Sequence, residues 1–163
     1  MPSAPRFCKA GPPARHANGA VVDVELLRSP EWIERNDVQV GRWFSFDLTE
    51  IEVEGRGFVR SIVDGPDVPH GPGAVVTGRF VTRQAANLVR VTFEDGTQWT
   101  GTRNHPVWSP ADGDWRGLGD FLPGMSVSTR EGFAIVASVE SLPETAPVYN
   151  IEVAGEHVYQ VTE

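Results

Sequence analysis

Short runs of alternating apolar and polar residues recur along most of the chain. Turn-forming residues separate them at intervals of about 8–12 positions, which is typical of an antiparallel sandwich or barrel. Strands are predicted over 21–27, 42–48, 55–63, 74–83, 88–96, 97–102, 125–130, 133–142, 148–155 and 157–163. No long window has the 3.6-residue period of an amphipathic helix. The pattern therefore predicts an all-β fold.

Two local signals add detail to this pattern. Asp95-Gly96 stands between two adjacent runs, and this dipeptide favours a tight hairpin turn. Ser29 precedes Pro30 and two acidic residues, which together predict a short helix over 29–36 with Ser29 as its N-cap. Every other element of the prediction is a strand or a turn.

The first 19 residues, MPSAPRFCKAGPPARHANG, differ from the rest in composition and are rich in Pro, Gly, Ala and Arg. Pro12-Pro13 and Asn18-Gly19 are strong breakers of regular structure. Residues 1–19 are therefore expected to form a loosely ordered lead-in, and residues 20–163 a β domain. A chain of 163 residues is long enough for one domain with a buried core.

Charge and composition exclude several partners. The formal net charge is −8, with 22 acidic against 14 basic side chains, so we expect no binding to nucleic acid or to an anionic membrane surface. No apolar run approaches the ~18–20 residues of a membrane span, and the first residues lack the apolar core of a signal peptide. The single cysteine excludes a disulfide framework. Compartment and oligomeric state stay open.

The stretch 100–108, TGTRNHPVW, holds the strongest candidates for chemistry. His105 follows Thr102 by three positions, at the end of a predicted hairpin strand, where side chains can reach a site. Imidazole can exchange a proton near neutral pH, and a hydroxyl can polarise an amide. The alternative is structural: His105 hydrogen-bonds the backbone at a strand end, and Thr102 is a β-forming residue. Local pattern alone leaves both interpretations open.

The remaining candidates are weaker. His157 precedes an alternating run and is also consistent with a structural role. Cys8 would need an activated, accessible thiolate to act as a nucleophile, and the alternative is an incidental exposed thiol. No histidines stand two or four residues apart, so no metal site is expected.

Three stretches within residues 88–163 carry a further pattern: LVRVTFEDGTQWTGTRNHPVWSP, GDWRGLGDFLPGMSV and APVYNIEVAGEHVYQV. In this order they resemble the hedgehog/intein (Hint) family, in the version attached to Rhs-like and other bacterial polymorphic toxins. The first looks like the Thr-x-x-His motif with its preceding hairpin. The third looks like the late Val-Tyr-(Asp/Asn) strand followed by Gly-x-His. Asn150 stands where many members have aspartate.

This resemblance implies a horseshoe of twisted antiparallel strands that cleaves a peptide bond of its own polypeptide, in cis and without a cofactor. His105 would protonate the departing amide nitrogen, and Thr102 would hold that amide polarised. His157 would assist the second step, and Cys8 would be the nucleophile. The partners would be flanking segments of the same polypeptide, and an exported bacterial toxin is one possible context.

The chain departs from the family pattern at both ends. The family's opening cysteine is followed by Gly-Thr, which CKAGPPARHANG lacks, and the family ends in His-Asn where this chain reads HVYQVTE. These departures indicate a truncated or degenerate member. Two alternatives follow: a non-catalytic interaction or spacer module that kept the fold and lost the chemistry, or a β-rich binding domain with a chance match.

Overall fold

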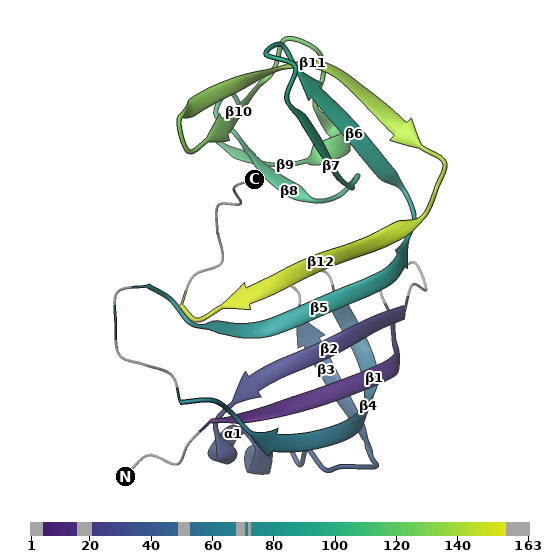
Figure 1. Ribbon diagram of the computed structural model, residues 1–163, viewed down its shortest axis with the longest axis vertical. Coiled ribbons are helices and arrows are strands. Elements are labelled where there is room, and N and C mark those ends of the chain that lie inside the picture. Colours follow the sequence, from purple (N-terminus) through teal and green to yellow (C-terminus); the bar gives the residue numbers. More distant parts are fainter. Residues whose placement is uncertain (1–4, 16–20, 49–52, 68–70, 72, 156–163) are drawn as a thin grey trace. The chain divides into compact units, whose positions relative to one another are not determined.

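The computed structural model describes residues 5–15, 21–48, 53–67, 71 and 73–155 (Figure 1). One short helix, α1 (Pro30–Arg35), and one 3-10 turn, η2 (Leu118–Asp120), accompany the strands. The strands are β1 (Arg6–Arg15), β2 (Val21–Arg28), β3 (Trp43–Leu48), β4 (Val53–Asp64), β5 (Val76–Ala85), β6 (Leu88–Phe93), β7 (Gln98–Thr102), β8 (Pro106–Ser109), β9 (Asp114–Gly117), β10 (Ser126–Thr129), β11 (Gly132–Leu142) and β12 (Ala146–Val153).

The predicted all-β architecture is confirmed, and every strand pairing that the structure describes is antiparallel. The predicted helix is also confirmed, with the Ser29 hydroxyl accepting from the Trp32 amide at 3.2 Å. The Asp95-Gly96 hairpin is confirmed by a positive φ of 87° at Gly96, which suits glycine. The predicted strand over 157–163 lies outside the described residues.

The chain divides into two compact units. The first unit comprises the described residues up to Arg83 together with 149–155, and the second comprises 84–148. The sequence predicts a single β domain over 20–163. Nothing in the composition marks the division, because the chain passes from one unit to the other inside two regular strands, β5 and β12.

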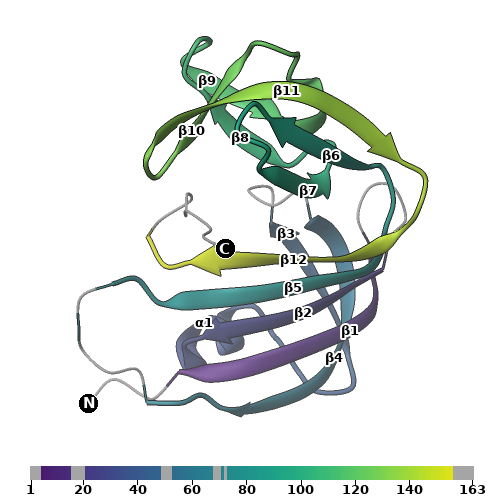
Figure 2. The ribbon, with the colours of Figure 1, turned by 45° about the horizontal axis from the view of Figure 1, so that its top comes forward.

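The first unit contains a six-stranded sheet in the order β12-β5-β2-β1-β4-β3. Figure 2 shows β5, β2 and β1 as neighbouring strands of this sheet. Strand β1 is central, since Cys8 is paired with Leu26 of β2 on one side and with Ile62 of β4 on the other.

The loosely ordered lead-in predicted over 1–19 is therefore wrong for residues 6–15. Pro12 and Pro13 argued against a strand, because proline cannot donate to a sheet ladder. The structure accommodates them at an irregularity, where the β1–β2 register shifts between Ala10 and Ala14. A bulge of this kind lets a strand continue past residues that cannot pair.

Alternate residues of β2 point inward and build the core of the first unit. Val22, Val24 and Leu26 are buried and pack with Ala10 and Phe80 in one apolar cluster. A neighbouring cluster, formed on the same sheet and under α1, consists of Cys8, Ile33, Val38 and Val59. This period-two burial is the pattern from which the sequence predicts the strand.

The second unit contains a four-stranded sheet, β10-β11-β6-β7, and a separate hairpin, β8-β9. Its core is apolar and almost fully buried. The members are Val89, Val91, Phe93, Leu118, Phe121, Val127 and Val136. Leu118 is the first residue of η2, and Phe121 follows its last residue. This small turn is therefore part of the core of the unit that carries the His105 motif.

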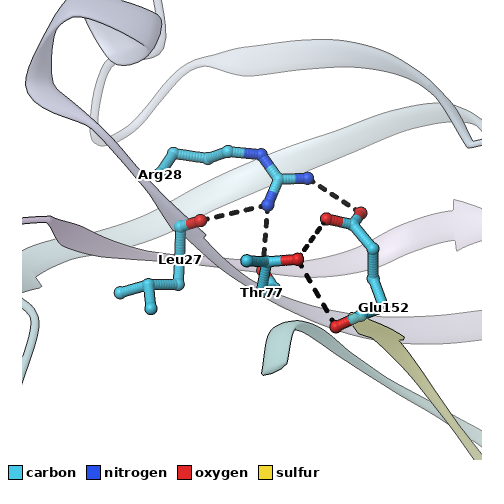
Figure 3. A network of polar contacts seen from close by, with 4 residues as sticks. All are labelled: Leu27, Arg28, Thr77 and Glu152. Carbon is cyan, nitrogen blue, oxygen red and sulfur yellow. Dashed lines mark hydrogen bonds and ion pairs between the residues drawn. The ribbon is translucent and has the colours of Figure 1, made fainter. Parts of the chain in front are cut away.

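A polar network ties the last described strand of the first unit to its neighbours (Figure 3). Arg28 of β2 donates to the Glu152 carboxylate at 2.9 Å and to the Thr77 carbonyl at 2.9 Å. The Thr77 hydroxyl donates to the same carboxylate at 2.6 Å.

Across the part of the chain that the structure describes, no helix is long and apolar enough to cross a membrane.

Candidate functional site

Thr102 and His105 are the two ends of a single β-turn. Thr102 is the last residue of β7, and the His105 amide donates to the Thr102 carbonyl at 3.0 Å. This hydrogen bond between positions i and i+3 brings the two Cα atoms within ~7 Å, as in β-turns generally. The three-residue spacing that the sequence singles out is therefore the spacing of one turn, which places both residues at the same corner of the second unit.

Both backbone polar groups of His105 form hydrogen bonds. Its amide closes the turn, and its carbonyl accepts from the Leu118 amide at 2.8 Å. Pro106 follows at once and begins β8, so the chain leaves the turn in an extended conformation. The backbone of His105 is thus fixed between β7, β8 and η2.

The imidazole of His105 is accessible and has a perturbed pKa. Although solvent reaches the residue, nearby protein atoms partly desolvate the ring, and this desolvation lowers the pKa of His105 from its ordinary 6.5. At neutral pH the ring is then mainly neutral and, when protonated, is a stronger proton donor than a free imidazolium. An accessible group with these properties can carry out acid–base chemistry.

Arg103, between the two motif residues, was not predicted as a site residue. Its amide donates to the Asn87 carbonyl at 2.9 Å, and its carbonyl accepts from the Gly119 amide at 2.8 Å. Its guanidinium donates to the Gly119 carbonyl at 2.8 Å and to the Ser141 hydroxyl at 3.0 Å. No local pattern in the sequence marks this role, because the partners of the guanidinium lie 16 and 38 positions away.

Cys8 belongs to the core of the first unit. Its side chain is 3% exposed in the middle strand of the sheet, and burial raises the pKa of the Cys8 thiol, with the nearby charge of Arg28 acting in the opposite direction. Nucleophilic attack requires an accessible thiolate, and both burial and a raised pKa work against one. The placement of Cys8 supports neither the predicted nucleophile nor the alternative of an exposed thiol.

Two further residues singled out in the sequence are His157 and Asn150. His157 lies outside the described residues. Asn150 lies on β12 and accepts from the Ile151 amide through its side-chain oxygen at 2.9 Å. Within the described ranges, no three His, Cys, Asp or Glu side chains converge in a way that would hold a metal ion.

Structures of inteins and of an intein-like domain are similar to this chain. The bacterial intein-like domain from Clostridium thermocellum is 16% identical, with a TM-score of 0.45, over 95% of this chain and 88% of that one. The TvoVMA intein is 12% identical, with a TM-score of 0.48, over 93% and 89%. The PabCDC21-1 intein is 20% identical, with a TM-score of 0.47, over 80% and 77%.

Comparison with protein-family models finds no match, and comparison with curated proteins finds none either. The structural similarities combine low identity with TM-scores below 0.5. They therefore carry no argument about activity, which has to be argued from the turn between Thr102 and His105 itself.

Proposed function

We propose that this chain is an intein-like self-processing domain, which cleaves a peptide bond of its own polypeptide with His105 as the proton donor. The observation that carries the proposal is the β-turn that joins the Thr102 carbonyl to the His105 amide at 3.0 Å. The turn places a hydroxyl and an accessible imidazole of lowered pKa at one corner. The resemblance of residues 88–163 to the Hint family supports the same chemistry.

The proposed reaction is an acyl shift within one polypeptide. A nucleophilic sulfur or oxygen attacks the preceding carbonyl carbon, the C–N bond breaks, and His105 delivers a proton to the departing nitrogen. The proton of the nucleophile returns to the imidazole, so an amide becomes an ester or thioester and a free amine. Water or an added thiol then attacks the carbonyl carbon of this ester, the C–O or C–S bond breaks, and two separate fragments are released. Thr102 polarises the amide, and the intramolecular arrangement supplies the effective concentration of the reactants.

The structure does not favour Cys8 as the nucleophile. Cys8 is the single cysteine of the sequence, and its burial does not favour attack. Its placement favours a second candidate function, a β-rich interaction or spacer module that kept the fold without the chemistry. We assign the bacterial toxin-like context, and the role of His157 in a second step, to the family resemblance alone.

The test is the intact mass, followed over time, of the whole chain fused between two inert reporter domains. We expect fragments to accumulate, and His105→Ala to slow their formation about 10²–10⁴-fold, as for loss of a general acid. His70→Ala, which removes a histidine from a Gly/Pro-rich stretch, is the matched control and should cleave at the parental rate.

Two further variants and one control separate the remaining roles. Thr102→Ala should slow cleavage, while Thr100→Ala, an exposed threonine on the same strand, should not. Cys8→Ala tests the nucleophile separately from the proton donor. An unchanged mass for the parent chain, also with added thiol, would contradict self-processing and favour the non-catalytic module.

A further inference from the structure

We propose that Arg103 is the positioning residue of this site and holds the turn between Thr102 and His105 against η2 and β11. The expected effect of Arg103 on cleavage rests on the proposed function. The structural part of the inference, the fixing of the His105 backbone, stands on contacts of the second unit alone.

Arg103 makes contacts in three directions. Its backbone amide and carbonyl bind Asn87 and Gly119, which fixes the middle of the turn to the start of β6 and to η2. Its guanidinium reaches the Gly119 carbonyl at 2.8 Å and the Ser141 hydroxyl of β11 at 3.0 Å, and it lies 3.6 Å from an Asp120 carboxylate oxygen. One residue thus ties the turn to three separate segments.

On one side, the Arg103 side chain lies so close to the backbone of η2 that a side chain at Gly119 would meet it. A Cβ atom at Gly119 would lie 2.6 Å from Cγ and 2.9 Å from Nη1 of Arg103. A Cβ atom at Gly117 would lie 3.0 Å from the Arg103 carbonyl oxygen. Such close approach favours glycine at both positions, because neither leaves room for a Cβ atom without a shift of Arg103.

These contacts reach His105 through η2. Arg103 binds both backbone groups of Gly119, and the neighbouring Leu118 amide donates to the His105 carbonyl at 2.8 Å. Loss of the guanidinium should therefore release η2 from the turn and with it the carbonyl of His105. The backbone that carries the imidazole would then lose one of the contacts that fix its position in the turn.

The experiment compares Arg103→Met with Arg90→Met in the full chain. Arg90 is a matched control: its side chain is 38% exposed against 40% for Arg103, and it pairs with Glu140, the residue next to Ser141 on β11. Both variants lose one positive charge and keep an unbranched side chain. Amide hydrogen exchange, the His105 imidazole NMR signal and cleavage of the reporter fusion are measured for each.

For Arg103→Met we expect exchange at the His105, Leu118 and Gly119 amides to quicken about tenfold or more, since hydrogen bonds to a charged group are lost. The Glu94 amide, which binds the Ile135 carbonyl, should exchange as before. The His105 Cε1–Hε1 signal should shift at constant pH, and cleavage should slow. Arg90→Met should change none of these, and Arg103→Lys, which keeps the charge, should restore part of the cleavage.

Unchanged exchange and an unchanged His105 signal in Arg103→Met would overturn the inference. Equal acceleration at Glu94 would also overturn it, since Arg103 would then support the unit as a whole. If the parent chain does not cleave at all, the proposed function fails. Exchange and the His105 signal still decide the role of Arg103.

Discussion

Arg28 and Glu152 form an ion pair at 2.9 Å although 124 positions separate them in the sequence. The pair is largely shielded from water, with side-chain exposures of 14% and 22%. Thr77 bonds to both partners, so the carboxylate and the guanidinium each have further hydrogen bonds (Figure 3). A shielded pair with these additional hydrogen bonds specifies the alignment of β12 on β5.

Replacing Glu152 should loosen this edge of the sheet. We expect Glu152→Gln to lower the free energy of unfolding by about 1–2 kcal/mol, because the ion pair is reduced to a neutral hydrogen bond and the largely shielded charge of Arg28 is left without a counter-charge. Urea unfolding measures the loss. Exchange at the Ala154 amide, which donates to the Val75 carbonyl at 2.8 Å, locates it. Glu140→Gln, in an exposed pair, should change the free energy by less than about 0.5 kcal/mol.

The pKa of His105 predicts a pH dependence of stability. Desolvation lowers the pKa in the folded state below 6.5, so the unfolded chain binds a proton more readily than the folded chain. Above pH 6.5 the ring is neutral in both states, so His105 does not affect stability. As the pH drops through and below 6.5, the unfolded chain takes up the proton first, and the free energy of unfolding falls. Titration by NMR should give a midpoint below 6.5, moving to about 6.5 in urea. A midpoint above 6.5 in the folded chain would contradict this assignment.

A methyl group at Gly119 should disturb the turn from the opposite side. The added Cβ would meet the Arg103 side chain at 2.6–3.0 Å and force it away from the Gly119 carbonyl. We expect Gly119→Ala to cost about 1–3 kcal/mol of stability, as for overpacking, and to quicken exchange at the His105 amide. Gly71→Ala, where nothing lies within 4 Å, is the control and should be neutral.

The thiol of Cys8 should be unreactive in the folded chain. Burial limits access, and the raised pKa reduces the thiolate fraction at neutral pH. An aromatic disulfide reagent should therefore react slowly with the native protein and at the rate of a free thiol in urea. Equally rapid reaction in both states would show an accessible cysteine and would restore Cys8 as a candidate nucleophile.

Two phenylalanines of the second unit should differ sharply in their contribution to stability. Phe93 is 1% exposed and packs edge-to-face against Trp99 at a centroid distance of 4.6 Å, whereas Phe133 is 69% exposed. Phe93→Ala should cost about 3–5 kcal/mol through lost burial and a residual cavity. Phe133→Ala should stay within about 0.5 kcal/mol. Thermal unfolding distinguishes the two, and similar losses would place Phe133 in a buried contact.

The elements that the sequence predicts correctly are those with a local cause. Alternation in β2 follows from the burial of Val22, Val24 and Leu26, and α1 begins where Ser29 caps it. Strand β1 could not be predicted in this way, since its prolines are bad strand formers. Its pairing with β2 and β4 comes from tertiary structure, which outweighs local preference.

The candidate site divides in the same manner. Thr102 and His105 are three positions apart at the predicted end of a strand, so a local bend is enough to bring them to the same corner, and the structure shows that this bend is a β-turn. Arg103 acts through Gly119 and Ser141, which lie 16 and 38 positions away. No spacing rule relates positions so far apart, and only the fold brings them together.

The path of the chain through β5 and β12 has a consequence for synthesis on the ribosome. One edge of β5 pairs with β2, which precedes it in the chain. The other edge of β5 pairs with β12, which emerges from the ribosome about sixty residues later. At a typical translation rate this leaves a sheet edge uncovered for roughly 3 to 12 seconds. During that interval the edge can pair with any extended chain nearby, so crowded ribosomes or chaperone shortage should favour aggregation of nascent chains.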